Sequence, residues 1–513
     1  MQQGGRRIWP VALGAALLAT LSAGVAVAAA GSLIFVQQQK DGVGGVEGID
    51  QPLGVATSPD GRHAYVTGGT DDAVATFARD PGTSALSFVG FLQNGLGGMT
   101  VLDEPEGVAV APDGRNVYVA AFGGDAVVVF SRSPTSGELS FVEQHTDGVG
   151  GVDGLSGAEG VSVSPDGRNV YVAGNNDNAV AVFSRDPATG ALTFVEQQKD
   201  GVGGVDGLGG AAYVAPSPDG RSVYVTGLDD DAVAVFSREP ATGALTFVEQ
   251  QKDGVGGVDG LLGAFGVASS PDARNVYVVG FDDDAVAVFS RDPATGGLTF
   301  VEQQKDGVGG VDGLLGAVLI AVSPDGANVY VTGRDDFAVV TFSRDPATGA
   351  LAFVEQDKDG VDGVDGLASA FGLDAACDGR SVYATGFADD AVAAFSREGG
   401  APGTCAPDLE FTASKQKIDK AVEAVATCGL EACTVEVTGK LKGVRKKPAL
   451  RPATAEIDFD EDQALSLGLG RRARRKARKA RKEGEKVFAK MTATATDLAG
   501  NDALPETVKI KLK

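Results

Sequence analysis

The chain has 513 residues and a formal net charge of −25. A chain of this length exceeds one ordinary hydrophobic core, so we expect at least two domains. The acidic excess lies before residue 400 and the tail after it is basic. This balance argues against a nucleic-acid-binding protein, because such proteins present a basic face to the phosphates.

Residues 1–30 have the pattern of an export signal. Arg6 and Arg7 precede an apolar run, and small residues near 28–30 suit cleavage. We therefore expect a secreted or cell-surface protein that loses this segment. An uncleaved membrane anchor is the alternative.

A 53-residue repeat organises the chain from residue 31 to residue 400. Its anchor is the leucine of an L-x-F-V run, which recurs at a constant interval at Leu33, Leu86, Leu139, Leu192, Leu245, Leu298 and Leu351. A period of this size indicates a propeller, a solenoid or another repeat array.

Each repeat contains four short runs rich in β-branched and aromatic residues, separated by turn sequences. In one unit these runs are 160–165, 169–174, 179–185 and 192–197. Four antiparallel strands with short turns form one blade of a β-propeller. We call these four runs strands A, B, C and D in chain order.

The repeats predict a closed ring of seven blades. Seven A-B-C blocks and seven D runs are present, but the D run at Leu33 precedes every A strand, and the last block has no D run after it. We therefore predict an all-β fold in which the N-terminal strand completes the last blade. Such closure leaves no free sheet edge between the first and last blades.

The motif "SPDGRNVYV" and its variants resemble the YVTN-type repeats of the seven-bladed, lactonase-like (6-phosphogluconolactonase-like) propeller family. The resemblance covers residues 31–400. It implies the propeller fold and raises lactone hydrolysis as an activity, although this repeat serves enzymes and non-enzymes alike.

A Gly/Pro-rich linker at 401–408 leads to a second domain at 409–513. Runs with alternating polarity in this tail predict strands, and the segment resembles the small immunoglobulin-like β-sandwiches of exported bacterial proteins. Between two of these runs, 471–486 reads as a short, very basic helix. It is either a solvated crossover or a patch that binds an anionic cell-surface polymer.

Four cysteines follow the repeats, and an even number in an exported chain favours disulfides. Three pairings are open. The pairing that we favour is Cys377 with Cys405 and Cys428 with Cys433.

The two ends of the propeller differ in charge. The A-to-B and C-to-D turns share one face and balance Asp against Arg, whereas the B-to-C turns and D-to-A loops share the other face and are strongly acidic. Such acidic, glycine-spaced loops suit calcium, which binds several hard oxygens. The candidate ligands are Asp200, Asp206, Asp253, Asp259, Asp306 and Asp312; a solvated acidic loop is the alternative.

Two positions on the acidic face vary between blades that are otherwise nearly constant. The first is at the start of strand A, at Leu53, Glu106, Glu159, Ala212, Phe265, Val318 and Phe371. The second is at the B-to-C tip, at Gly69, Phe122, Asn175, Leu228, Phe281, Arg334 and Phe387. We expect a ligand site at this mouth, lined by Glu106, Glu159, Phe265, Phe371, Phe122, Phe281 and Phe387. Relaxed drift of loop tips would produce the same pattern.

Near-identity of the blades favours a non-catalytic binding or scaffold module, a monomer whose acidic face receives cations, a glycan or a basic protein. The alternative is a hydrolase that opens a sugar-acid lactone at the axial channel, with Glu106, Glu159 and Arg334 as an acid/base and oxyanion set. Two histidines are present, and His63 reads as a surface turn residue.

Overall fold

The computed structural model describes residues 31–399, Cys405 and, beyond it, the backbone of seven strands. The predicted export signal at 1–30, most of the linker at 401–408 and the predicted basic helix at 471–486 lie outside the described residues. So do the side chains of Cys428 and Cys433. Among the described residues no helix is long and apolar enough to cross a membrane.

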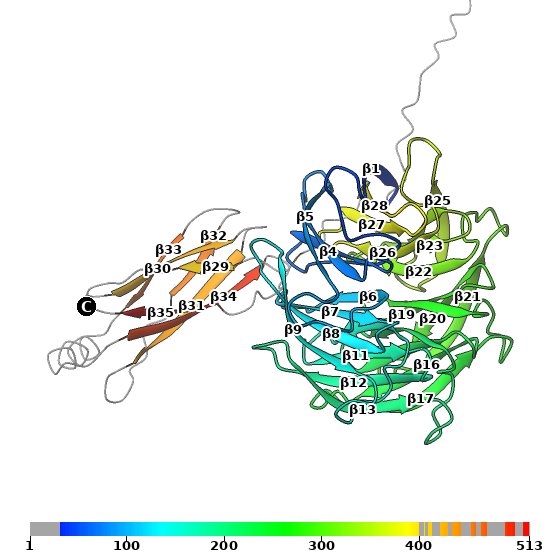
Figure 1. Cartoon of the computed structure of the whole chain (residues 1–513), viewed down its shortest axis with the longest axis horizontal. Coiled ribbons are helices and arrows are strands. Elements are labelled where there is room, and N and C mark those ends of the chain that lie inside the picture. Colours follow the sequence, from blue (N-terminus) through cyan, green and yellow to red (C-terminus); the bar gives the residue numbers. More distant parts are fainter. Residues whose placement is uncertain are drawn as a thin grey trace, which may run out of the picture.

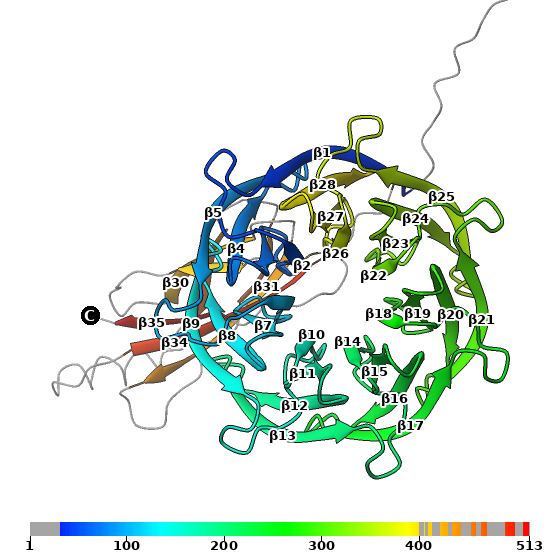
Figure 2. The ribbon, with the colours of Figure 1, turned by 45° about the vertical axis from the view of Figure 1, so that its right-hand side comes forward.

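Residues 31–399 form seven four-stranded antiparallel sheets arranged around an axis (Figure 1, Figure 2). The innermost strands, A, are β2 (Pro52–Thr57), β6 (Pro105–Val110), β10 (Ala158–Val163), β14 (Ala211–Pro216), β18 (Ala264–Ser269), β22 (Ala317–Val322) and β26 (Ala370–Ala375). Strands B are β3 (His63–Gly68), β7 (Asn116–Ala121), β11 (Asn169–Gly174), β15 (Ser222–Gly227), β19 (Asn275–Gly280), β23 (Asn328–Gly333) and β27 (Ser381–Gly386).

Strands C are β4 (Ala73–Arg79), β8 (Ala126–Arg132), β12 (Ala179–Arg185), β16 (Ala232–Arg238), β20 (Ala285–Arg291), β24 (Ala338–Arg344) and β28 (Ala391–Arg397). The outermost strands, D, are β5 (Leu86–Gln93), β9 (Leu139–Thr146), β13 (Leu192–Lys199), β17 (Leu245–Lys252), β21 (Leu298–Lys305), β25 (Leu351–Lys358) and β1 (Leu33–Lys40). The blades are numbered 1 to 7 from β2. The structure confirms the predicted blade, with strand A beginning two residues earlier than expected and strand D ending two residues later.

The ring closes as predicted. Strand β1 pairs with β28, from Leu33 opposite Arg397 to Lys40 opposite Ala391, and completes the sheet of β26, β27 and β28. Figure 2 shows β1 lying on the outside of this last blade. The first and last segments of the propeller are therefore held in one sheet.

The core lies between neighbouring blades. Strands B and C bury almost every residue, and each of the seven tyrosines of the strand B motif is fully buried. Clusters of Val, Ala, Leu and Phe join the sheets pairwise, as in the contact of Tyr118 and Val129 in blade 2 with Val172 and Phe183 in blade 3. Burial of apolar side chains on both faces of each sheet stabilises the ring by about 1.5–3 kcal/mol for each large residue.

A polar network links each blade to the next on the face of the A-to-B and C-to-D turns, which we call the turn face. Arg185 of blade 3 is buried; its Nε donates to the hydroxyl of Tyr118 (2.6 Å), and its Nη2 donates to both carboxylate oxygens of Asp113 (2.9 and 2.8 Å), both in blade 2. The Tyr118 hydroxyl in turn donates to Gly190 O of blade 3 (2.9 Å). Charge-assisted bonds of this kind are stronger than neutral ones.

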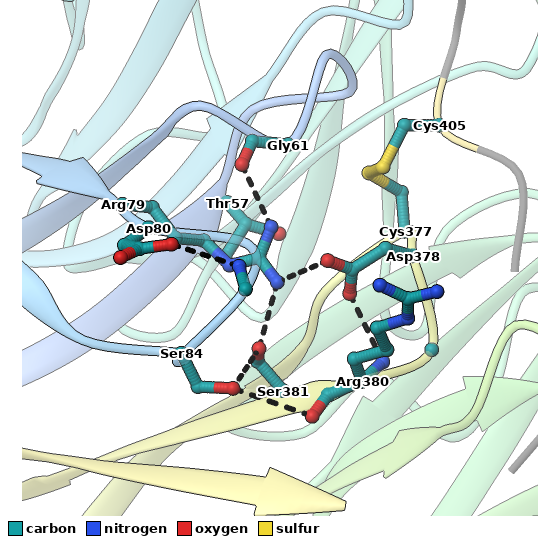
Figure 3. A network of polar contacts seen from close by, with 12 residues as sticks. Thr57, Gly61, Arg79, Asp80, Ser84, Cys377, Asp378, Arg380, Ser381 and Cys405 are labelled. Carbon is teal, nitrogen blue, oxygen red and sulfur yellow. Dashed lines mark hydrogen bonds and ion pairs between the residues drawn. A yellow bond between two sulfur atoms is a disulfide. The ribbon is translucent and has the colours of Figure 1, made fainter. Parts of the chain in front are cut away.

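The same network closes the ring between blades 1 and 7 (Figure 3). Arg79 donates to Gly61 O (2.7 Å) and to Ser381 Oγ (2.7 Å), and it pairs with Asp378. Beside it lies a disulfide between Cys377 and Cys405, the pairing favoured from the sequence. Cys405 of the linker is thus bonded to the turn face.

His63 is not the surface turn residue that we expected. It is buried, and its Nδ1 lies 2.7 Å from Nη2 of Arg132. Burial, followed by the charge of Arg132, lowers the pKa of His63 to about 4. A neutral His63 therefore accepts from the guanidinium, as the Asn116 carbonyl does for Arg185 at the next junction (2.8 Å).

Beyond Cys405 the strands form two further antiparallel sheets. One has the order β29 (Leu409–Thr412), β30 (Ala421–Cys428) and β33 (Gln463–Gly468). The other has the order β32 (Ala453–Ile457), β31 (Cys433–Lys442), β34 (Phe488–Asp497) and β35 (Glu506–Lys511). The sheets contact each other through β29 and β35 and through β32 and β33. The immunoglobulin-like assignment of residues 409–513 stays a prediction.

Candidate active site at the axial mouth

The A strands are the innermost strands of the ring (Figure 2), and each follows an acidic D-to-A loop. Their first residues therefore lie at the mouth of the axis on the acidic face. Their second residue is half-buried there in blades 1, 2, 5 and 7, and buried in blade 3, where it is Glu159. In blades 4 and 6 the second residues, Ala212 and Val318, are buried, and the third residues, Tyr213 and Leu319, are half-buried. The predicted ring is therefore present, but two of its members are replaced by their neighbours in sequence.

The third position explains this change. In most blades it is a glycine, because the neighbouring strand passes close by; a Cβ on Gly107 would lie 2.4 Å from Glu159 O, and one on Gly160 would lie 2.6 Å from Ala212 O. Blades 4 and 6 place Tyr213 and Leu319 at this position instead. The departure of "AAYV" from the repeated glycine was the sequence signal for Tyr213, and our comparison of second residues alone missed it.

One side of the mouth is aromatic. The Tyr213 and Phe265 ring centroids are 5.3 Å apart, and Phe265 meets Phe371 edge to face at 5.8 Å. These residues come from blades 4, 5 and 7, so the two phenylalanines meet across the position of blade 6. Edge-to-face contact of this kind adds to the stability that burial gives the rings.

The other side of the mouth carries two glutamates on adjacent blades. Burial raises the pKa of Glu106 well above its usual range, and the carboxylates of Glu159 and Glu104 raise it further. Burial also raises the pKa of Glu159 to about 7, against the opposing effect of a hydrogen bond from Asn175 Nδ2 to Glu159 Oε2 (2.9 Å). The two carboxyls thus share a poorly hydrated site in which one proton is retained near neutral pH.

The phenol of Tyr213 belongs to the same site. Burial, then the charges of Glu106 and Glu159, raise its pKa well above the usual range. Its hydroxyl is buried and has no hydrogen-bond partner among the described residues. A neutral hydroxyl of this kind is an available donor beside two carboxyls.

The second variable ring, at the B-to-C tips, contributes fewer contacts to the site around the two glutamates. Asn175 reaches Glu159, and Phe122, Phe281 and Phe387 are half-buried at their tips. Arg334 lies over the ring of Phe281 (5.0 Å from Cζ to the centroid) and forms an ion pair with Asp335 (3.4 Å). These two contacts engage Arg334 within the second variable ring, and its part in the acid/base and oxyanion set stays a prediction.

The acidic loops bring aspartates together farther from the axis. Two come from the loop that enters a blade and one from the B-to-C turn of that blade, with carboxylate oxygens within 4.8 Å of one another in each group. The groups are Asp147, Asp153 and Asp177; Asp200, Asp206 and Asp230; Asp253, Asp259 and Asp283; Asp306, Asp312 and Asp336; and Asp359, Asp365 and Asp389. All six aspartates proposed as metal ligands are included. The sequence comparison missed the third member of each group.

Hydrogen bonds already engage these carboxylates. In blade 4, Asp200 accepts from Leu208 N (3.2 Å), Asp206 accepts from Gln250 Nε2 (2.6 Å), and Asp230 pairs with Lys252 (3.6 Å). A lysine pairs with the third aspartate in all five groups. Each group therefore combines a loop-stabilising role with oxygens that suit a hard cation.

Comparison with known proteins identifies the propeller. The family model described as "Lactonase, 7-bladed beta-propeller" matches four overlapping segments, residues 19–153, 55–206, 162–312 and 267–399, which together cover most of the chain. The chain belongs to this family. The match spans all seven blades and includes both glutamates of the mouth.

Two curated relatives carry the name 6-phosphogluconolactonase. The protein from Klebsiella pneumoniae is 25% identical over 257 residues, which are 49% of this chain and 71% of that protein. The protein from Bacillus subtilis is 28% identical over 144 residues, which are 28% of this chain and 40% of that protein. The chain thus spans less than half the length of the second relative.

Two solved structures are similar to the chain. The periplasmic gluconolactonase of Pseudomonas aeruginosa is 25% identical, with a TM-score of 0.49 over 60% of this chain and 86% of that one. The hydrazine synthase of Kuenenia stuttgartiensis is 18% identical, with a TM-score of 0.50 over 70% of this chain and 99% of that one. At this level of identity the second likeness shows the fold alone.

Proposed function

We propose that the propeller hydrolyses lactones at the axial mouth, with Glu106, Glu159 and Tyr213 as the reacting groups. The observation that carries this proposal is the pairing of two glutamates of raised pKa, Glu159 buried and Glu106 half-buried, with the phenol of Tyr213. Its hydroxyl has no hydrogen-bond partner among the described residues, and its ring adjoins the aromatic wall. Membership of the lactonase family and the names of the curated relatives support it. Of the two functions considered from the sequence, these findings favour the hydrolase over the non-catalytic module.

The chemistry divides between the two carboxyls. The ionised carboxylate takes a proton from water as the water oxygen bonds to the lactone carbonyl carbon. The tetrahedral oxyanion accepts a hydrogen bond from the Tyr213 hydroxyl, the role of an oxyanion-hole donor. The protonated carboxyl then donates its proton to the ring oxygen as the ester C–O bond breaks, which gives the open hydroxy acid.

Hydrolysis of glucono-δ-lactone tests the proposal after subtraction of the spontaneous rate. We expect Glu106→Gln and Glu159→Gln each to lower kcat/KM by about 10²–10⁴-fold, the usual contribution of a general acid or base. Glu138→Gln is the matched control, because Glu138 is exposed on the turn face and should leave the rate unchanged. Turnover that survives both mouth substitutions in folded protein would refute the proposed site.

A second candidate function is binding of calcium by the acidic loops, which the five aspartate groups favour. Blade 2 has no such group, because Asn94, Thr100 and Gly124 stand where the aspartates of the five groups stand. Thermal melts in calcium and in EDTA should differ if the groups bind the ion. Identical melting temperatures would rule the function out.

A further inference from the structure

The charges around the mouth bear on which lactones can enter it. The lysines and arginines of residues 31–399 fall into two sets by face. Arginines of strand C and of the A-to-B turns lie on the turn face, away from the mouth. The acidic face holds Arg334 and five lysines, Lys40, Lys199, Lys252, Lys305 and Lys358.

All six of these cations are already engaged. Each lysine pairs with the third aspartate of its group, within 3.0–3.8 Å. Arg334 pairs with Asp335 and lies over Phe281. A phosphate arriving at the mouth would therefore meet cations whose charge a carboxylate already offsets.

The mouth itself adds only negative or neutral groups. Glu104 is exposed at the rim, directly before β6, and its carboxylate acts on Glu106. The remaining wall consists of Phe265 and Phe371, with Leu53 and Leu319 half-buried beside them. An aromatic wall suits the apolar C–H face of an uncharged ring, whereas like charges a few ångströms apart repel strongly where water is scarce.

We infer that the mouth selects lactones that carry no negative charge, and that phosphorylated sugar lactones are poor substrates for this chain. This inference rests on the proposed hydrolase function and deepens it. The inferred substrates differ from the phosphorylated lactone that the curated relatives' name, 6-phosphogluconolactonase, denotes.

The test compares glucono-δ-lactone with its 6-phosphorylated counterpart on the full chain, with spontaneous hydrolysis subtracted. We expect kcat/KM to be at least 100-fold lower for the phosphorylated lactone in low salt, and the ratio to narrow in 0.5 M NaCl as the charges are screened. Equal kcat/KM values for the two lactones would overturn the inference while leaving the hydrolase function standing. Failure to hydrolyse either lactone would instead overturn the hydrolase function, and the inference with it.

Charge reversal at the rim sharpens the test. Glu104→Lys should raise the relative kcat/KM for the phosphorylated lactone at least tenfold, whereas the control Glu138→Lys on the turn face should leave the ratio unchanged. If Glu104→Lys and Glu138→Lys changed the ratio of kcat/KM for the two lactones equally, the inference would be overturned. The net charge of the protein, and not the charge at the mouth, would then set the preference between the lactones.

Discussion

The two ends of the propeller use the same repeat in opposite ways. On the turn face, an arginine, an aspartate and a tyrosine recur at the blade junctions, and every copy touches the neighbouring blade. At the axial mouth the corresponding residues differ from blade to blade, as Glu106, Glu159, Tyr213 and Phe265 illustrate. Variation is tolerated where no junction depends on the side chain, and that freedom allows an asymmetric site in a nearly symmetric ring.

Removal of one network arginine should produce the largest loss of stability. Arg185→Met leaves Asp113 and the Tyr118 hydroxyl without their buried partner, so we expect a loss of about 3–5 kcal/mol in the free energy of unfolding. Urea unfolding of the propeller measures it. Arg168→Met, in the exposed A-to-B turn of the same blade, is the control and should cost less than about 0.5 kcal/mol. Similar losses in the two variants would mean that the junctions do not depend on the network.

Loss of the disulfide should come next. Cys377 and Cys405 are separated by 28 residues, and a crosslink over such a loop contributes about 3 kcal/mol by restricting the unfolded chain. The double variant Cys377→Ser/Cys405→Ser should therefore have a lower Tm than the parent. Its lactone hydrolysis should be unchanged, since the bond lies on the turn face. An unchanged Tm would show that the ring closes equally well without the bond.

Asp357, next to Lys358 at the end of β25, offers a smaller, pH-dependent effect. Its counterparts Gln198, Gln251 and Gln304 each donate to the carbonyl of the next outer strand, which an ionised aspartate cannot do. Burial, then the charge of Glu355, raises the pKa of Asp357 to about 7. The folded protein thus keeps a proton that the unfolded chain loses near pH 4, so stability falls as the pH rises from 4 to 7.

The substitution Asp357→Gln should remove this dependence. We expect it to stabilise the propeller by about 1–2 kcal/mol at pH 8, since it restores a buried hydrogen bond, and to have little effect below pH 4. Urea unfolding across this pH range measures the difference. Gln304→Asp should create the same pH dependence of stability at the neighbouring junction. If stability changed with pH in the same way in the parent and in both variants, the pH dependence could not be assigned to Asp357.

The lysines of the acidic loops should matter least. Lys252, whose side chain is 40% exposed, pairs with Asp230, so Lys252→Met should cost about 0.2–1 kcal/mol at low salt. The loss should shrink at high salt, because screening already weakens an exposed pair. Melting curves at two salt concentrations measure it. A large, salt-independent loss would show that the aspartate groups depend on the lysine as a buried pair does.

The sequence was sufficient for the fold because the repeat encodes each blade independently. The constant spacing predicted seven blades, and the unmatched run at Leu33 predicted the closing strand. It also located Glu106, Glu159, Phe265 and Phe371 at one mouth. The repeat spacing could not predict how these residues assemble into a site, because that depends on which side chains of different blades come into contact.

The errors have physical causes. Tyr213 stands at the third position of strand A, where most blades have a glycine because the neighbouring strand passes close by. Our comparison covered only the second position, so it did not include this ring. His63 begins strand β3 directly after the A-to-B turn, and Arg132 from the C strand of the next blade lies against it.

Because β1 completes the last blade, the propeller cannot finish folding until its last strand, β28, has been synthesised. Ser396 bonds to the backbone of Ile34, 362 residues earlier, so the first strand emerges from the ribosome long before its sheet exists. Until β28 has been made, β1 and the last blade present unpaired edges that favour association with other chains. Contacts of such long range slow folding. The final step is therefore a docking of the two ends of the propeller, and we expect truncated chains that lack β28 to aggregate rather than to form a smaller ring.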